Sequence, residues 1–170
     1  GVDGKWRFEI DDRMSGALAD PHVSMAGQNG TGVPIRERML HGDYFNAYPE
    51  AADIKVQAAK SALNNGEIGA MYYPPREGHG GYIPYQADSP DNGRSVLLHE
   101  LQHDAQNREG FSPGAELGNA DYRRAAGEVE ARTVQKRKDM TKSERQARPP
   151  WQDYDVPEHE QIVRALLGKP

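Results

Sequence analysis

The chain has 170 residues and a formal net charge of −5, with 36% hydrophobic and 28% charged residues. This length allows one compact domain with a modest core, and the acidic balance provides no basic face for nucleic acid or an anionic membrane. There is no cysteine. Disulfides, a thiolate nucleophile and cysteine-ligated zinc are therefore excluded, and a metal would need His, Asp or Glu.

We expect residues 1–170 to form a single domain excised from a longer protein, because the first residue is Gly1 rather than Met. No apolar run approaches the roughly 20 residues that cross a bilayer, so no membrane partner is expected. The expected partners are a protein or peptide substrate and other domains of the parent protein. The lack of cysteine suits a cytoplasmic location, with delivery into a host or target cell as the alternative.

The first half of the chain is predicted to form short strands. Residues 5–10 alternate apolar and polar side chains, which indicates a strand, whereas residues 15–35 are rich in Gly, Asn, Ser and Pro and predict a long loop. A short helix is expected at residues 44–48, ended by Pro49. Three further strands are expected, at residues 53–57, 67–73 and 81–86.

The last of these strands contains Pro84, which cannot donate to a β-ladder. We therefore expect it at the edge of a sheet, where it would pair with an extended substrate by strand addition. The Gly-rich residues 78–81 lack the Lys-Ser/Thr of a phosphate-binding loop and predict a hairpin turn.

The second half of the chain is predicted to be mainly helical. A helix over residues 91–108, with Gly110 as its stop signal, has one apolar side. That side consists of Val96, Leu97, Leu98, Leu101 and Ala105. Further helices are expected at residues 120–138, 143–147 and 158–167, and an extended segment at residues 151–157.

The helix at residues 91–108 carries the motif His99-Glu100-Leu101-Gln102-His103. Residues four apart share one helical face, so His99 and His103 can direct imidazole nitrogens at one ion. Glu100 would lie beside that ion and take a proton from zinc-bound water. The motif therefore predicts a zinc hydrolase, and the simpler alternative is a solvated helical face with two histidines.

A catalytic zinc usually has three protein ligands and one open position. The His-x-x-Gly-x-x-His continuation of metzincins does not follow His103, so a glutamate on the next long helix is the expected third ligand. Glu128 and Glu130 are both available, and because they lie about 200° apart on a helix only one can face the metal. The alternative role for Glu128 is that of an exposed partner of Arg124 or Arg132.

Gluzincins often take their third ligand from a Glu-x-x-Ala stretch, which Glu128-Val129-Glu130-Ala131 resembles. The resemblance implies that His99, His103 and Glu128 bind zinc. Many gluzincins place an aspartate four residues after this ligand, whereas this chain has Arg132, which cannot accept a hydrogen bond. The surroundings of the histidines must therefore differ from the usual pattern.

Several segments also resemble the metallopeptidase-like domains associated with large polyvalent proteins of phages and conjugative elements. These segments are residues 6–12, 48–50, 97–103 and 127–132. The resemblance implies an α+β, zincin-like fold, in which a small and mostly antiparallel sheet packs against the helix of the motif and a second, ligand-bearing helix. Gln106 is a further feature of this resemblance, without an assigned role.

Other polar residues are weaker candidates. Peptide hydrolysis also needs a donor that stabilises the oxyanion, and Tyr122, Tyr85 and His79 are available, although such residues more often pack or lie at the surface. Tyr122 is retained as the candidate oxyanion or substrate residue. The basic residues 132–148 are interspersed with acids and predict a solvated helical face rather than a surface that docks on DNA.

The sequence thus favours a zinc metalloendopeptidase, with Zn²⁺ as cofactor, that hydrolyses peptide bonds of a protein substrate. His99, His103 and Glu128 would hold the zinc, and Glu100 would activate water. Two alternatives share this site. One is a non-catalytic zinc-binding interaction module of a phage or mobile-element protein, and the other is a toxin or effector peptidase with one host target.

Overall fold

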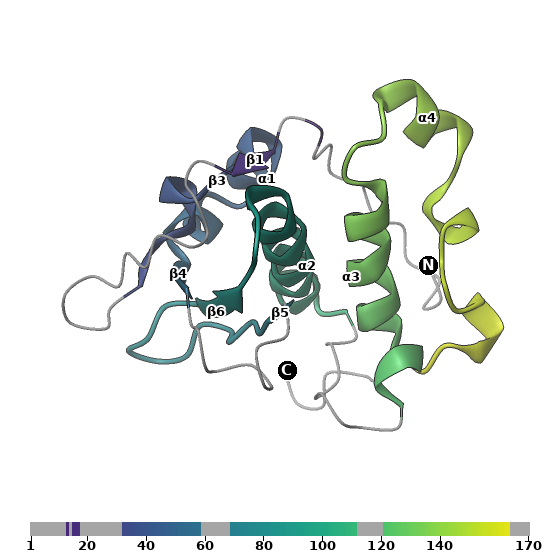
Figure 1. Cartoon of the computed structure of the whole chain (residues 1–170). Coiled ribbons are helices and arrows are strands. Elements are labelled where there is room, and N and C mark those ends of the chain that lie inside the picture. Colours follow the sequence, from purple (N-terminus) through teal and green to yellow (C-terminus); the bar gives the residue numbers. More distant parts are fainter. Residues whose placement is uncertain (1–12, 14, 18–31, 59–68, 112–120, 164–170) are drawn as a thin grey trace. The chain divides into compact units, whose positions relative to one another are not determined.

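The computed structural model describes residues 13, 15–17, 32–58, 69–111 and 121–163, and the predicted strand at residues 5–10 lies outside them. The described residues divide into two compact units, one within residues 10–101 and the other within residues 102–170. Helices and a small mixed sheet make this an α+β protein (Figure 1). The expected coarse fold class is therefore confirmed, and the single domain stays a prediction.

In the unit within residues 10–101, the described residues form two sheets. A four-stranded sheet has the order β2-β4-β6-β5, in which β4 and β6 are parallel and the other pairs are antiparallel. Its strands are β2 Val33–Pro34, β4 Lys55–Ala58, β6 Tyr82–Gln86 and β5 Gly69–Ala70. A second, two-stranded sheet pairs β1 Gly16–Ala17 with β3 Met39–Leu40.

The described parts of residues 15–35 are more regular than the predicted loop. They contain β1, β2 and the start of a 3-10 turn, Ile35–Glu37, while residues 18–31 lie outside the described part. The strands expected at residues 53–57 and 81–86 are confirmed as β4 and β6. Within the described residues 69–73, the third predicted strand is limited to β5 and a single bridge between Tyr73 and Tyr82.

The predicted edge position of the Pro84 strand is wrong, because β6 lies inside the sheet between β4 and β5. The carbonyl of Pro84 accepts a hydrogen bond from the backbone N–H of Met71 at 3.2 Å. In a strand the N and C=O of one residue point to the same side, so the missing N–H also faces this side. Since β5 ends at Ala70, the missing bond falls just beyond its end. Strand addition at residues 81–86 is excluded, because both sides of β6 are already paired.

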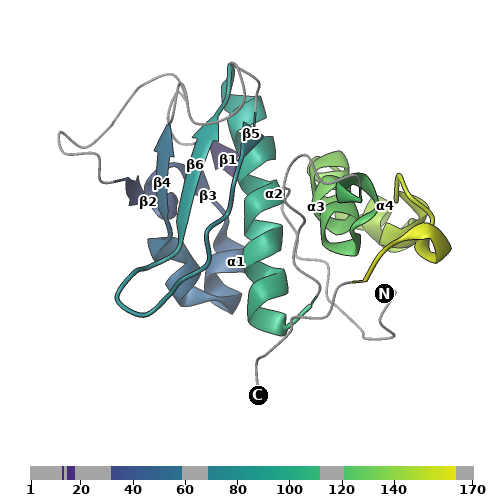
Figure 2. The same cartoon turned by 90° about the horizontal axis from the view of Figure 1, so that it is seen from below.

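Two helices accompany this sheet. Helix α1, Gly42–Ala47, matches the predicted short helix, and the Tyr44 hydroxyl donates to the carbonyl of Leu101 at 3.0 Å. The first half of helix α2, Pro90–Glu109, runs beside the sheet (Figure 2). Sheet and helix side chains share a core whose fully buried members include Ile35, Ile54, Val56, Ile83, Leu98 and Leu101.

The ends of α2 follow from local sequence signals. At the start, the Ser89 hydroxyl accepts a hydrogen bond from the backbone N–H of Asn92 at 3.2 Å, and Pro90 occupies the first helical position. At the end, Gly110 has φ +70°, and the N–H of buried Phe111 bonds the carbonyl of Gln106 at 2.8 Å. This glycine-centred cap confirms the predicted stop signal. The five residues of the predicted apolar side are all buried.

In the unit within residues 102–170, the described residues contain the second half of α2 and two further helices. These are α3, Ala126–Arg137, and α4, Lys142–Ala147, with 3-10 turns at Tyr122–Arg124, Pro150–Gln152 and Glu158–Glu160. The predicted helix at residues 143–147 is confirmed as α4. The one expected at residues 120–138 is interrupted at Ala125, whose ψ of 125° is not helical.

The C-terminal predictions need correction. A helix was expected over residues 158–167, but the described part holds only a 3-10 turn, after which Ile162 forms a bridge with Ala125. The carbonyl of Ile162 accepts a hydrogen bond from the N–H of Ala126 at 3.0 Å, which satisfies the first backbone donor of α3. The segment at 151–157, expected to be extended, begins within a 3-10 turn. Residues 164–167 lie outside the described part.

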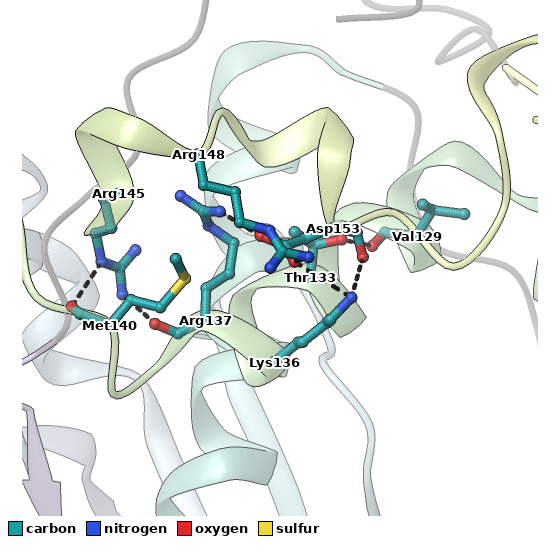
Figure 3. Close-up of polar contacts among 8 residues, drawn as sticks. All are labelled: Val129, Thr133, Lys136, Arg137, Met140, Arg145, Arg148 and Asp153. Atoms are coloured by element: carbon teal, nitrogen blue, oxygen red, sulfur yellow. Dashed lines mark hydrogen bonds and ion pairs between the residues drawn. The ribbon is translucent and has the colours of Figure 1, made fainter. Parts of the chain in front are cut away.

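Arg137 and Asp153 hold the C-terminal segment against α3 (Figure 3). The two form a buried ion pair, and Arg148 and Lys136 contact the same carboxylate at 2.6 and 3.2 Å. The backbone carbonyl of Arg137 also accepts from the guanidinium of Arg145 at 2.6 Å. The basic residues 132–148 are therefore not simply a solvated helical face, because one of them lies in the core of this unit.

Candidate metal centre

Helix α2 places the two histidines of the motif on one face, four residues apart, and both are half-buried. Glu128 is the third residue of α3 and is only 2% exposed. His99, His103 and Glu128 each offer one ligand atom, and these three atoms all lie within 4.8 Å of one another. The structure thus brings together the three residues predicted to bind zinc.

The spacing between His103 and Glu128 fits a small, tetrahedral cation. Nε2 of His103 lies 3.4 Å from Oε1 of Glu128. Nitrogen and oxygen ligands bind zinc at about 2.0–2.2 Å, and two ligands of a tetrahedral ion are then roughly 3.3–3.5 Å apart. Two imidazoles and one carboxylate are also a ligand set that zinc takes in hydrolases. Both spacing and chemistry therefore suit zinc.

The choice between the two glutamates of α3 follows from what each one contacts. Glu130 accepts hydrogen bonds from Gln102 at 3.3 Å and from Gln106 at 3.1 Å. Glu128, two residues earlier, faces His103 instead. The geometry therefore favours Glu128 over Glu130 as the third ligand.

The alternative role for Glu128, as an exposed partner of Arg124 or Arg132, does not hold. Glu128 is buried. The guanidinium of Arg124 donates to the carbonyl of Glu160 at 2.9 Å, and that of Arg132 pairs with Asp155 at 2.9 Å. Burial of a carboxylate is costly unless a hydrogen bond or a cation compensates it, which is consistent with a metal ligand at this position.

The start of α3 explains how Glu128 reaches its place. The N-cap residue Ala125 has no side-chain oxygen, and the backbone of Ile162 accepts the first helical N–H instead. This contact fixes the direction of the first turn. A carboxylate in that turn is also favoured by the helix dipole, whose positive end lies at the N-terminus. The position of Glu128 thus depends on a pairing with a residue far away in sequence.

Glu100, the predicted general base, directly follows the first histidine in α2 and is 4% exposed. Its neighbours Leu98 and Leu101 belong to the core. A carboxylate in such a setting is shielded from bulk water, which suits a group that must exchange one proton with a reacting molecule.

The candidate oxyanion residues lie in different surroundings. Tyr122 is half-buried in the 3-10 turn that precedes α3. Tyr85 is a core residue of β6 and is 4% exposed. His79 is exposed and pairs with Arg76 across a turn that contains Gly78 at φ +80°. This confirms the predicted hairpin, and Tyr122 remains the candidate of the three.

Gln106 contacts a residue of the candidate site, and the sequence left its role open. It is buried and contacts His103, Gly127 and Glu130. Its spacing of three residues from His103 places it on the same helical face, which is the sequence signal that could have indicated the contact.

Comparisons with known proteins give no relative for this chain: no protein family, curated protein or solved structure matches it. Among the described residues, no helix has both the length and the apolar character needed to cross a bilayer. Any functional conclusion therefore depends on the site itself.

Proposed function

We propose that this chain is a zinc-dependent metallopeptidase with a zincin-like, gluzincin-type site. The observation that carries the proposal is the convergence of the ligand atoms of His99, His103 and Glu128 within 4.8 Å. The buried carboxylate of Glu100 next to the first histidine adds the second element that peptide hydrolysis needs. A cation-binding triad without such a carboxylate would support metal binding alone.

The roles of the residues follow from their chemistry. His99, His103 and Glu128 would hold the ion and leave one coordination position open. Zinc bound there would lower the pKa of a water ligand and polarise the carbonyl of the scissile peptide bond. Glu100 would take the proton from the attacking water and then deliver it to the nitrogen of the leaving amine. Tyr122 is the residue that we propose to assist at the substrate carbonyl.

The test combines metal analysis with cleavage of a peptide library by the purified chain. We expect about one zinc per chain in the wild type and in Glu100→Gln, and loss of zinc in His99→Ala. Cleavage should fall by about 10²–10⁴-fold in Glu100→Gln, which is the usual contribution of a general acid–base. Matched controls are His159→Ala and Glu158→Gln, which alter exposed residues of a 3-10 turn.

Each outcome decides between the candidates. Zinc binding without cleavage would replace the peptidase by a zinc-binding interaction module. Cleavage that Glu100→Gln leaves unchanged would contradict the role of Glu100 as the general base. Absence of zinc after supplementation would contradict both. A toxin or effector peptidase would have the same site. It would be distinguished from other peptidases by its effect on a host cell, in which the wild type would be toxic and Glu100→Gln would not.

A further inference from the structure

Gln106 is 1% exposed and makes three polar contacts with its side-chain amide. Its Nε2 donates to the backbone carbonyl of Gly127 at 2.9 Å and to Oε2 of Glu130 at 3.1 Å. Its Oε1 lies 2.8 Å from Nδ1 of His103. One side chain of α2 therefore links a histidine of the metal centre to the first turns of α3.

The orientation of this amide is determined by its partners. A carbonyl and a carboxylate can only accept hydrogen bonds, so the side of Gln106 that faces Gly127 and Glu130 must carry the NH₂ group. The opposite orientation would place an amide oxygen against two other oxygens. The oxygen of Gln106 therefore faces His103.

This orientation also determines where His103 carries its proton. Since Oε1 of Gln106 is an acceptor, Nδ1 of His103 must be the donor in their contact. In a neutral imidazole the other nitrogen then keeps its lone pair. That nitrogen, Nε2, is the atom that lies 3.4 Å from Glu128.

We propose that Gln106 is a positioning residue that holds His103 in the tautomer with Nδ1 protonated, and that Glu130 holds Gln106 in the required orientation. As far as it concerns metal binding, the inference rests on the proposed zinc site. Histidines that bind metals generally donate their second N–H to a carboxylate or a carbonyl, which fixes tautomer and ring orientation. Here an amide of α2 takes this role.

The contact with Gly127 gives Gln106 a second task. Gly127 directly precedes Glu128, and its carbonyl is held by the same amide that contacts His103. Two of the three ligands are thus set relative to each other by one buried side chain. A carboxylate at position 106 would accept from His103 but could not donate to Gly127 or Glu130.

The tautomer can be measured directly, without metal and without substrate. Long-range ¹H–¹⁵N correlation spectra of the metal-free protein, at a pH where the imidazoles are neutral, distinguish the two tautomers of His103. In the metal-free wild type the carboxylate of Glu128 also faces the ring, as an acceptor at Nε2. The comparison is therefore made in Glu128→Ala, where that acceptor is removed. We expect an Nδ1-protonated ring in Glu128→Ala and a shift toward Nε2 protonation when Gln106→Met is added, which keeps the size of the side chain. Gln102→Met is the matched control, because Gln102 also donates to Glu130 but has no such contact with His103.

Zinc titration supplies the second measurement. Loss of such an outer contact typically weakens metal binding about 10–100-fold, which we expect for Gln106→Met and not for Gln102→Met. Zinc binding should be weaker in Gln106→Glu as well, because the new carboxylate would face the carboxylate of Glu130. Adding Glu130→Gln restores a hydrogen-bond donor between positions 106 and 130. The double variant should therefore recover part of the zinc affinity, together with the Nδ1-protonated ring of His103.

The outcomes separate this inference from the proposed function. An Nε2-protonated His103 in Glu128→Ala, or a tautomer that the addition of Gln106→Met leaves unchanged, would overturn the role of Gln106 whatever the protein does with zinc. The expected tautomer in Glu128→Ala, together with a wild type that binds no zinc, would support the role of Gln106 in orienting His103 and contradict the zinc site. If Gln106→Met does not fold, the Gln106→Glu/Glu130→Gln double variant provides the same two measurements.

Discussion

The carboxylate of Asp153 and the guanidinium of Arg137 form an ion pair in which the side chains are 3% and 1% exposed. Removal of one partner of a buried pair leaves the other charge uncompensated, which costs about 3–5 kcal/mol. We therefore predict that Asp153→Ala lowers the free energy of unfolding by this amount in urea denaturation. Asp155→Ala is the control, because its pair with Arg132 is more exposed and should contribute about 0–1 kcal/mol. Equal losses of unfolding free energy in the two variants would contradict a special contribution of the buried Arg137–Asp153 pair.

The same pair predicts a dependence of stability on pH. Burial alone would raise the pKa of Asp153, but the hydrogen bonds from Arg137 and Lys136 and the charge of Arg148 outweigh it and hold the pKa below 3.8. A carboxyl group with a lowered folded-state pKa contributes stability that is fully present above its unfolded-state pKa and is lost as the pH falls through the folded-state value. The difference in unfolding free energy between wild type and Asp153→Ala should therefore be constant near neutral pH and shrink below pH 3.8. A difference that stays constant into acid would refute the lowered pKa.

Gly110 provides a test of how α2 ends. Its φ of +70° lies in the left-handed region, and a Cβ added there would meet no atom within 4 Å. The cost of Gly110→Ala should therefore come from the backbone alone, at about 1–2 kcal/mol in thermal unfolding. Gly42→Ala, at the first position of α1, also meets no atom within 4 Å and needs no positive φ. We expect Gly42→Ala to leave stability unchanged or to raise it slightly. A loss of stability comparable to that of Gly110→Ala would exclude backbone strain as the cause at Gly110.

Zinc should stabilise the folded chain, because the three ligands converge only when α2 and α3 are formed. A ligand that binds the folded state alone adds about 2.7 kcal/mol when its free concentration is 100 times its Kd. We predict an increase in the melting temperature with zinc that a chelator reverses. Glu128→Gln should show little or no increase, and Glu158→Gln should respond like the wild type. A zinc effect of the same size in Glu128→Gln would place the ion elsewhere.

The parts of the site that follow from local sequence were the predictable ones. The spacing of His99 and His103 fixes their common face as soon as the segment is helical, and Gly110 marks its end. The choice between Glu128 and Glu130 could not be made from the neighbouring sequence. The helix that carries them is buried around much of its circumference, including Gly127, so the apolar pattern did not identify the face toward the histidines.

Where the structure differs from the predicted elements, the cause is also a contact distant in sequence. Pro84 was expected at a sheet edge, yet its missing donor faces a partner strand that has already ended. The predicted helix after residue 158 competes with backbone pairing between Ile162 and Ala125, which propensity alone does not reveal. In both cases the partner that decides the structure is distant in sequence.

Calorimetric titration of the metal-free chain with zinc is the decisive test of the metal centre. We predict one site in the wild type, loss of high-affinity binding in His99→Ala, His103→Ala and Glu128→Gln, and retained binding in Glu130→Gln, whose amide oxygen can still accept a hydrogen bond from Gln106. No binding by the wild type would contradict the metal centre. Loss in Glu130→Gln equal to that in Glu128→Gln would contradict the assignment of Glu128 as the third ligand.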